Sequence, residues 1–167
     1  MLRKNQQSLR KTTHGGFSLV EVLVALLVLS VGLLGLAALQ TTSLRYNTES
    51  YFRTQATYLA YDIIDRMRTN SLGVTGMNYD VPNSGSASVA MSSTAACGTG
   101  SCSTSDLAKY DLGQWYARMG QVLPGSTIPA ANLATITRTA GNQVTIIINW
   151  VERDILQTQT WTVQLPT

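Results

Sequence analysis

The sequence predicts an α+β protein in which a long N-terminal helix packs on a small antiparallel β-sheet, with one additional short helix. Two observations predict this fold. Apolar residues dominate residues 17–39 and then recur at helical spacing up to Met67, whereas residues 133–165 are rich in Thr, Val, Ile and Trp. A chain of 167 residues with this organisation allows one domain with one modest core.

The composition indicates a folded chain in which charge is unevenly distributed. Charged residues make up 13% of the sequence and hydrophobic residues 44%, which excludes the composition typical of disordered chains. The formal net charge of +3 depends on four cations before residue 17, namely Arg3, Lys4, Arg10 and Lys11. Without them 8 basic residues face 9 acidic ones, so the rest of the chain lacks the positive excess typical of nucleic-acid-binding proteins.

A basic leader precedes an apolar run that is long enough to cross a membrane. Residues 17–39 contain one Glu and no Lys, Arg, Asp or Pro, and as a helix they would span about 35 Å, against about 30 Å for a hydrocarbon core. The positive-inside rule leaves the leader, residues 1–16, in the cytoplasm and places residues 40–167 outside it. A secretory signal with a weak cleavage site at Ala37 and Ala38 is the alternative, but its apolar region would be shorter.

One carboxylate, Glu21, interrupts the apolar run. Ionisable residues inside a membrane are functional candidates by default, although a position near the cytoplasmic edge would let Glu21 reach water at little cost. The sequence Gly16-Phe17-Ser18-Leu19-Val20-Glu21 follows a basic leader and opens the apolar run. This arrangement resembles the processing signature of the type IV pilin superfamily.

The resemblance implies a processing site and an assembly residue. In that superfamily a prepilin peptidase cuts after the glycine and the new N-terminus is methylated, which implies cleavage between Gly16 and Phe17 and N-methylation of Phe17. The family glutamate corresponds to Glu21, which would pair with the N-terminal amine of a neighbouring subunit. Such a pair is physically reasonable, because a buried carboxylate without a partner is costly. The implied fold is the type IV pilin fold, with residues 17–39 as the filament-core half of the spine helix.

The helical pattern continues beyond the membrane to about Thr69. One apolar stripe follows the helical period, formed by Leu44, Phe52, Ala56, Leu59, Ile63 and Met67. Ion pairs at i,i+4 are expected between Glu49 and Arg53 and between Asp62 and Arg66. The arginines of this segment could form a phosphate track, but the interleaved acids favour a solvated helix face.

The end of this helix resembles one branch of the superfamily. Asp65-Arg66-Met67-Arg68-Thr69-Asn70 is similar to the spine end of PilV-type minor pilins, also called pilus modification proteins. Asn70 and Gly73 offer a helix stop. Asp111-Leu112-Gly113-Gln114-Trp115 and Leu123-Pro124-Gly125 extend the likeness beyond the spine.

Residues 71–105 are dominated by Ser, Gly, Thr and Ala, which predicts a loop. The two cysteines, Cys97 and Cys102, lie within it, and outside the cytoplasm a disulfide between them is expected, contributing about 2 kcal/mol. A closed zinc site would need further ligands, and the only histidine, His14, belongs to the leader. A redox pair is the alternative, but nothing marks either thiol as activated. The sequence implies no metal and no cofactor.

A second helix and three strands complete the predicted head. The helix is expected from Ser105, as its N-cap, to about Val122, with a buried stripe of Ala108, Leu112, Trp115, Met119 and Val122. The strands are expected at Leu133–Arg138, Gln143–Trp150 and Gln157–Leu165, with a turn at 140–142. The aromatic residues of the helix favour core packing over a carbohydrate platform.

The resemblance implies a minor pilin, a structural subunit that primes and joins type IV pilus assembly at or near the filament tip. The implied partners are the prepilin peptidase, other minor pilins, the major pilin, the inner-membrane assembly platform with its ATPase, and a tip adhesin. The chain would begin as a single-pass protein of the bacterial inner membrane with a periplasmic C-terminus, and would end in the filament.

Three alternatives remain open at this point. A minor pseudopilin of a type II secretion system shares the leader, Glu21 and the helix-plus-sheet plan. A membrane-anchored periplasmic enzyme would need a metal, phosphate-loop or nucleophile motif, and the sequence offers only Asp106 and Asp111, which point different ways on a helix. A DNA-binding uptake pilin would bind in a salt-sensitive manner, which the charge balance of the head disfavours.

Overall fold

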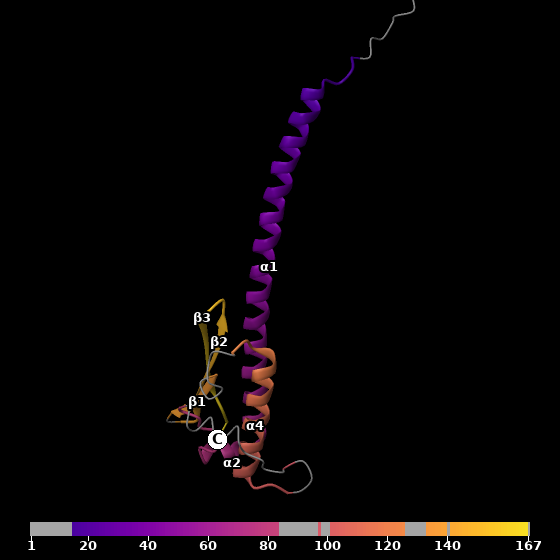
Figure 1. Cartoon of the computed structure of the whole chain (residues 1–167). Coiled ribbons are helices and arrows are strands. Elements are labelled where there is room, and N and C mark those ends of the chain that lie inside the picture. The colour runs from indigo at the N-terminus through magenta and orange to yellow at the C-terminus, as the bar shows by residue number, and fades with distance from the viewer. Residues whose placement is uncertain (1–14, 84–96, 98–100, 126–132, 140, 167) are drawn as a thin grey trace, which may run out of the picture. The chain divides into compact units, whose positions relative to one another are not determined.

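The computed structural model describes residues 15–83, 97, 101–125, 133–139 and 141–166. The chain divides into two compact units, residues 1–45 and residues 46–167, and helix α1 (Leu19–Thr69) contributes residues to both. Figure 1 labels the elements. The four leader cations and His14 lie outside the described residues.

The first unit is the apolar part of α1. By length and composition α1 is able to cross a membrane. Its large apolar side chains face outward, as Val20 and Leu34 show with exposed fractions of 65% and 72%. No described side chain of residues 15–45 is buried. Such a surface is unfavourable in water and needs lipid or protein to cover it.

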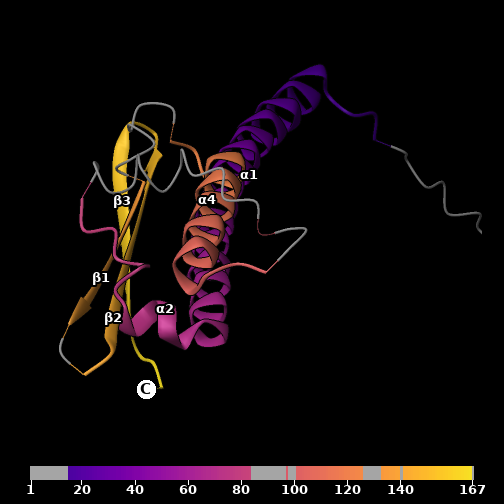
Figure 2. The same cartoon turned by 90° about the horizontal axis from the view of Figure 1, so that it is seen from below.

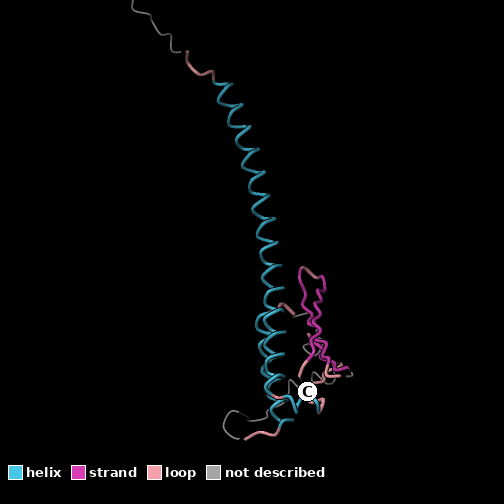
Figure 3. The backbone as a smooth tube through the Cα atoms, turned by 180° about the vertical axis from the view of Figure 1, so that it is seen from behind, coloured by secondary structure: helices cyan, strands magenta, loops and turns pink. Residues whose placement is uncertain are grey.

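The second unit is a layer of helices on a sheet (Figures 1 and 2). The helical layer consists of the second half of α1 and of α4 (Thr104–Val122), and a short helix, α2 (Ser71–Thr75), follows α1. The sheet consists of β1 (Ala134–Thr139), β2 (Gln143–Glu152) and β3 (Ile155–Gln164) in the order β1-β2-β3, all antiparallel, as Figure 3 also shows. The predicted α+β fold, with a spine helix, an antiparallel sheet and an extra helix, is confirmed.

The apolar stripe of α1 supplies one wall of the core. Ala56, Leu59, Ile63 and Met67 are buried, as predicted, and Phe52 is half-buried. The prediction for Leu44 was wrong, because Leu44 belongs to the first unit and is 67% exposed. The apolar stripe of α1 therefore contributes to the core only from about residue 52 onward.

Helix α4 begins slightly earlier than predicted. Its N-cap is Ser103 rather than Ser105: the Ser103 hydroxyl accepts a hydrogen bond from the Asp106 amide at 3.1 Å and donates one to Asp106 Oδ2 at 2.8 Å. Ser103 is the N-cap because its hydroxyl reaches the backbone amide of Asp106, three residues further along the chain. The predicted stripe is buried at Ala108, Leu112, Trp115 and Met119, whereas Val122 is half-buried.

The segment predicted as a loop opens with α2 instead. Asn70 accepts a hydrogen bond from the Gly73 amide at 3.2 Å and thereby caps this five-residue helix, which buries Gly73 and Val74. The remainder of the predicted loop is described only in part, since residues 84–96 and 98–100 lie outside the described residues.

The inner face of the sheet packs on the helical layer. Val144, Ile146, Ile148 and Trp150 alternate onto this face of β2 and are all buried, as predicted. Ile146 faces Trp161 of β3 in the register. The β2–β3 turn places Arg153 and Asp154 at positive φ, and Gly141 and Asn142 do so in the predicted β1–β2 turn.

Polar atoms of two large aromatic residues of α4 join this helix to α1 and to the sheet. Trp115 Nε1 donates to the carbonyl of Leu59 at 2.8 Å, and the Tyr116 hydroxyl donates to the carbonyl of Ala134 at the same distance. The two rings meet edge to face with centroids 5.2 Å apart. Both residues belong to the core, Trp115 as its position in the predicted stripe indicates and Tyr116 from outside that stripe, which agrees with the prediction that the aromatic residues of this helix pack in the core.

Candidate assembly site

The residues that would be processed stand just before α1. Gly16 and Phe17 precede the helix, and the carbonyl of Ser18 accepts the first hydrogen bonds, from the amides of Glu21 at 3.0 Å and Val22 at 3.3 Å. A side chain added at Gly16 would meet no atom within 4 Å, and Phe17 is 84% exposed. Both residues that flank the Gly16–Phe17 peptide bond are thus exposed with respect to the part of the chain that the structure describes.

Glu21 stands beside an apolar groove on the first turns of α1. The groove has a volume of about 330 Å³ and is lined by Phe17, Glu21, Leu26, Leu29 and two smaller residues. The Glu21 carboxylate is exposed and accepts no hydrogen bond from any described residue. The first turn favours a negative charge through the helix dipole, but a carboxylate in apolar surroundings still needs a cation or donor from outside the chain.

The arginine-rich end of α1 forms a polar network with α4. Arg66 Nε binds Asp62 Oδ1 at 3.2 Å, the i,i+4 pair predicted from the sequence, and Arg66 Nη1 binds Asp111 Oδ1 of α4 at the same distance. Asp111 is buried, with an exposed fraction of 7%. Burial lowers the pKa of Arg66, but the charged interactions with Asp62 and Asp111 together outweigh burial and raise this pKa above its usual value. The other predicted pair, Glu49 with Arg53, forms at 3.1 Å on the exposed face.

Tyr79 and Asn70 extend this network around the end of α1. The Tyr79 hydroxyl donates to Asp111 Oδ2 at 2.6 Å, and Asn70 Nδ2 donates both to the Tyr79 oxygen at 3.2 Å and to the carbonyl of Thr104 at 2.8 Å. Burial first, and the hydrogen bond to Asp111 second, raise the pKa of Tyr79 above its usual value. The network therefore fastens α1, α2 and the start of α4 to one another.

The disulfide stands directly before α4. Cys97 and Cys102 are bonded, with 5.5 Å between their Cα atoms, and Ser103 follows as the N-cap of the helix. The covalent link, the cap and the hydrogen bond from Asn70 to Thr104 thus act within a few residues of one another. This concentration of restraints fixes where α4 begins.

Two family models match the chain. Residues 11–37 match the prokaryotic N-terminal methylation motif, and residues 38–113 match a family described as type IV pilin Tt1218. These matches support the type IV pilin superfamily. Pilins of this kind are structural subunits rather than enzymes, and the methylation motif implies processing by a prepilin peptidase. No curated protein and no solved structure matches the chain.

The matched segments coincide with the two sites described above. The methylation motif covers Gly16, Phe17 and Glu21, and its combination with the apolar part of α1 fits anchoring in the inner membrane followed by incorporation into a pilus. The pilin match covers Asn70 and ends just after Asp111, so it contains the polar network and the disulfide.

Sequence reasoning missed the part that Asp111 and Tyr79 play in the head. Asp111 lies three residues after Ala108 and four before Trp115, both buried, so the helical period puts it on the inner face of α4. A carboxylate at such a position is a signal for a buried charge pair. Nothing in the local sequence marks Tyr79, whose partners lie 9 and 32 residues away.

Proposed function

We propose that this chain is a minor pilin of the PilV type, which primes type IV pilus assembly and enters the filament at or near its tip. One observation carries the proposal: Gly16-Phe17-Ser18-Leu19-Val20-Glu21 opens a helix whose apolar residues are uncovered. The spine-end sequence Asp65–Asn70 supports the PilV-type assignment through its likeness to the spine end of those pilins. As a structural subunit the chain performs no catalysis.

Processing would occur between Gly16 and Phe17. The prepilin peptidase removes the leader and its four cations, and Phe17 becomes the N-methylated terminus. The exposure of Gly16 and Phe17 before α1 suits this cleavage, since no described residue covers the peptide bond between them. The second unit then lies on the periplasmic side of the inner membrane, anchored by a single helix.

Glu21 would accept the terminal amine of a neighbouring subunit. Its carboxylate has no donor among the described residues, and it stands next to an apolar groove. In a bilayer or filament core, an ammonium group is the partner that repays the cost of burying a carboxylate. The neighbours would be other minor pilins and the major pilin, brought together by the assembly platform, with a tip adhesin above them.

Mass spectrometry of the N-terminus tests the proposal directly. Chain recovered from membranes of cells with an active prepilin peptidase should begin at N-methylated Phe17. An N-terminus at Met1, or one near Ala38, would refute processing as a pilin. Because a pseudopilin of a type II secretion system would also begin at Phe17, sheared filaments are analysed next: a minor pilin is recovered with the pili, whereas a pseudopilin remains with the cells.

A further inference from the structure

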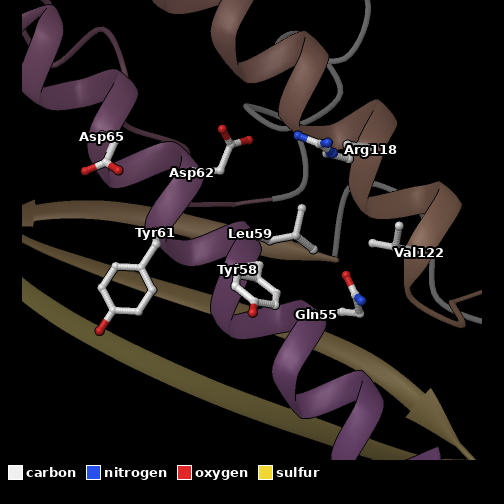
Figure 4. Close-up of a pocket in the computed structure, with 8 residues that line it drawn as sticks. All are labelled: Gln55, Tyr58, Leu59, Tyr61, Asp62, Asp65, Arg118 and Val122. Atoms are coloured by element: carbon white, nitrogen blue, oxygen red, sulfur yellow. The ribbon is translucent and has the colours of Figure 1, made fainter.

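A groove runs between α1 and α4 on the surface of the second unit. The hydrogen bonds from Trp115 to Leu59 and from Asn70 to Thr104 show that the two helices lie side by side and antiparallel. The groove between them has a volume of about 460 Å³. Figure 4 shows Asp62, Asp65, Tyr58 and Tyr61 on the α1 side and Arg118 on the α4 side.

The charges of this groove are only partly neutralised by other described residues, because Asp62 pairs with Arg66 through Oδ1 alone, at 3.2 Å. Among the described residues Arg118 has no ion pair and no hydrogen bond, although it stands across the groove from two carboxylates (Figure 4). Asp62 Oδ2 is buried and lacks a donor. Asp65 binds only Arg68, at 2.8 Å, in an exposed i,i+3 pair of the kind that contributes little. Each wall thus offers a charge that the opposite wall does not reach.

The α1 wall also exposes aromatic rings. Tyr58 and Tyr61 are 66% and 56% exposed, although both stand at the rim of the groove. Tyrosine is enriched in protein interfaces, and a guanidinium group stacks favourably on its ring. A surface that combines acids, tyrosines and a free arginine is complementary to another surface of the same kind.

We propose that this groove binds the same groove of a second copy of the chain, with the two-fold axis parallel to α1 and α4. Such an axis places the α1 wall of each copy against the α4 wall of the other at the same height. Arg118 of one copy then meets Asp62, Asp65 and the tyrosines of its partner, and the reciprocal contact forms at once, as an isologous interface requires.

This orientation also suits two chains in one membrane. A two-fold axis along the helices makes the Tyr46–Thr69 segments of the two chains run in the same direction, so the chain leads from each groove to its anchor through the same end of the segment. This step rests on the membrane anchoring contained in the proposed function. Confinement in a bilayer raises the effective concentration of one copy for the other, so a modest interface is sufficient.

The dimer is tested by cysteine cross-linking of full-length chains in isolated membranes. One copy carries Asp65→Cys and a first tag, and the other carries Arg118→Cys and a second tag, so that no cross-link can form within one chain. The native cysteines are already paired with each other. Copper phenanthroline should then produce a dimer that carries both tags.

The matched control replaces Arg118→Cys by Lys109→Cys, another exposed cation of α4 whose own partner is Asp106. We expect the Asp65–Arg118 pair to give at least about tenfold more tagged dimer than this control, as a specific charged interface would. Equal yields for the two pairs, or no dimer with either, would overturn the proposal and would indicate that the groove binds a different protein or none.

Charge reversal provides an independent readout. With Gln55→Cys in one copy and Val122→Cys in the other as reporters from opposite walls of the groove, the substitution Arg118→Asp in both copies should abolish cross-linking, because it sets acids against acids. Adding Asp65→Arg to the same chains should restore cross-linking, because an acid at position 118 of one copy then meets an arginine at position 65 of the other. Failure of this rescue, while both variants still reach the membrane, would refute the charge pairing. Mass spectrometry of the N-terminus on the same samples reports processing separately, so a failed dimer and a failed pilin assignment give different results.

Discussion

The hydroxyl of Tyr79 donates a hydrogen bond of 2.6 Å to Asp111 Oδ2, and Arg66 donates a hydrogen bond to the other oxygen of the same carboxylate, Oδ1. Tyr79 follows α2, Asp111 belongs to α4 and Arg66 to α1, so a single buried carboxylate gathers three parts of the head. A buried carboxylate is tolerated only when its oxygens are satisfied, and both oxygens are satisfied here. The head is therefore sensitive to each donor of this network.

Removal of the Tyr79 hydroxyl should destabilise the head. Tyr79→Phe leaves Asp111 Oδ2 buried without a donor and should lower the free energy of unfolding by about 1–3 kcal/mol. Urea titration of the full-length protein in detergent, followed by tryptophan fluorescence, measures this loss. Tyr58→Phe is the control, because that hydroxyl stands on an exposed ring. Equal midpoints for both variants would contradict the role assigned to Tyr79.

Two glycine-to-alanine substitutions should have opposite effects. A Cβ at Gly73 would lie 2.5 Å from Asn70 Nδ2, a side chain held by three hydrogen bonds, so Gly73→Ala should destabilise the junction of α1 and α2. A Cβ at Gly120 would meet nothing within 4 Å inside α4, so Gly120→Ala should stabilise the protein by about 0.5–1 kcal/mol through helix propensity. Thermal unfolding of both variants measures the two changes in stability. A loss of stability in Gly120→Ala would be inconsistent with this account.

Loss of the α4 cap should reduce stability and shift a titration. Ser103→Ala removes an N-cap, which costs about 1 kcal/mol. The hydrogen bond from Ser103 is the main cause that lowers the pKa of Asp106, and Lys109 is the second. As the pH falls, Asp106 therefore becomes protonated in the unfolded chain before it does so in the folded protein. The stability that this lowered pKa provides is therefore present at neutral pH and lost as the pH falls through the pKa of the folded state. NMR titration of Asp106 should show a higher pKa in Ser103→Ala, and an unchanged pKa would rule out the hydroxyl as its main cause.

Substitution of Glu21 should separate processing from assembly. Glu21→Ala leaves Gly16 and Phe17 intact, so the leader should still be removed and Phe17 methylated. Without the carboxylate the incoming amine has no partner, and the chain should be strongly depleted from sheared filaments. Immunoblots of membrane and pilus fractions measure this distribution. Glu49→Ala, which removes surface ion pairs with Arg53 and Arg153 of the second unit, is the matched control and should be incorporated normally.

Local sequence was sufficient for the long elements of this fold. The apolar stripe of α1 and the alternation of β2 repeat over many residues, and each reports the face that is buried. Helix α2 was missed because Ser71–Thr75 is short, contains a glycine and two β-branched residues, and depends on Asn70 as its cap. A helix of only five residues is too short to be predicted from helix propensity when its sequence includes such residues.

The candidate sites divide in the same way. Gly16, Phe17 and Glu21 belong to one contiguous motif, so the sequence alone marks them. The hydrogen bond between Arg66 and Asp111 joins residues 45 positions apart in the sequence. In the groove, Asp62 of α1 and Arg118 of α4 lie on opposite walls. The helical period marks Asp111 as inward-facing, but no spacing in the chain reveals the partner in either arrangement, because both arise from the packing of α4 on α1.

The position of the first core residues has a consequence for protein engineering. Every buried side chain of α1 lies at Ala56 or later, and the compact second unit begins at Tyr46. A truncated chain that starts at Tyr46 would keep the whole network, the described disulfide and the complete apolar interior. Such a truncation should fold as a water-soluble domain suitable for crystallisation, because the exposed apolar side chains of residues 17–39 are removed. Folding and anchorage are thus separable functions of one uninterrupted helix.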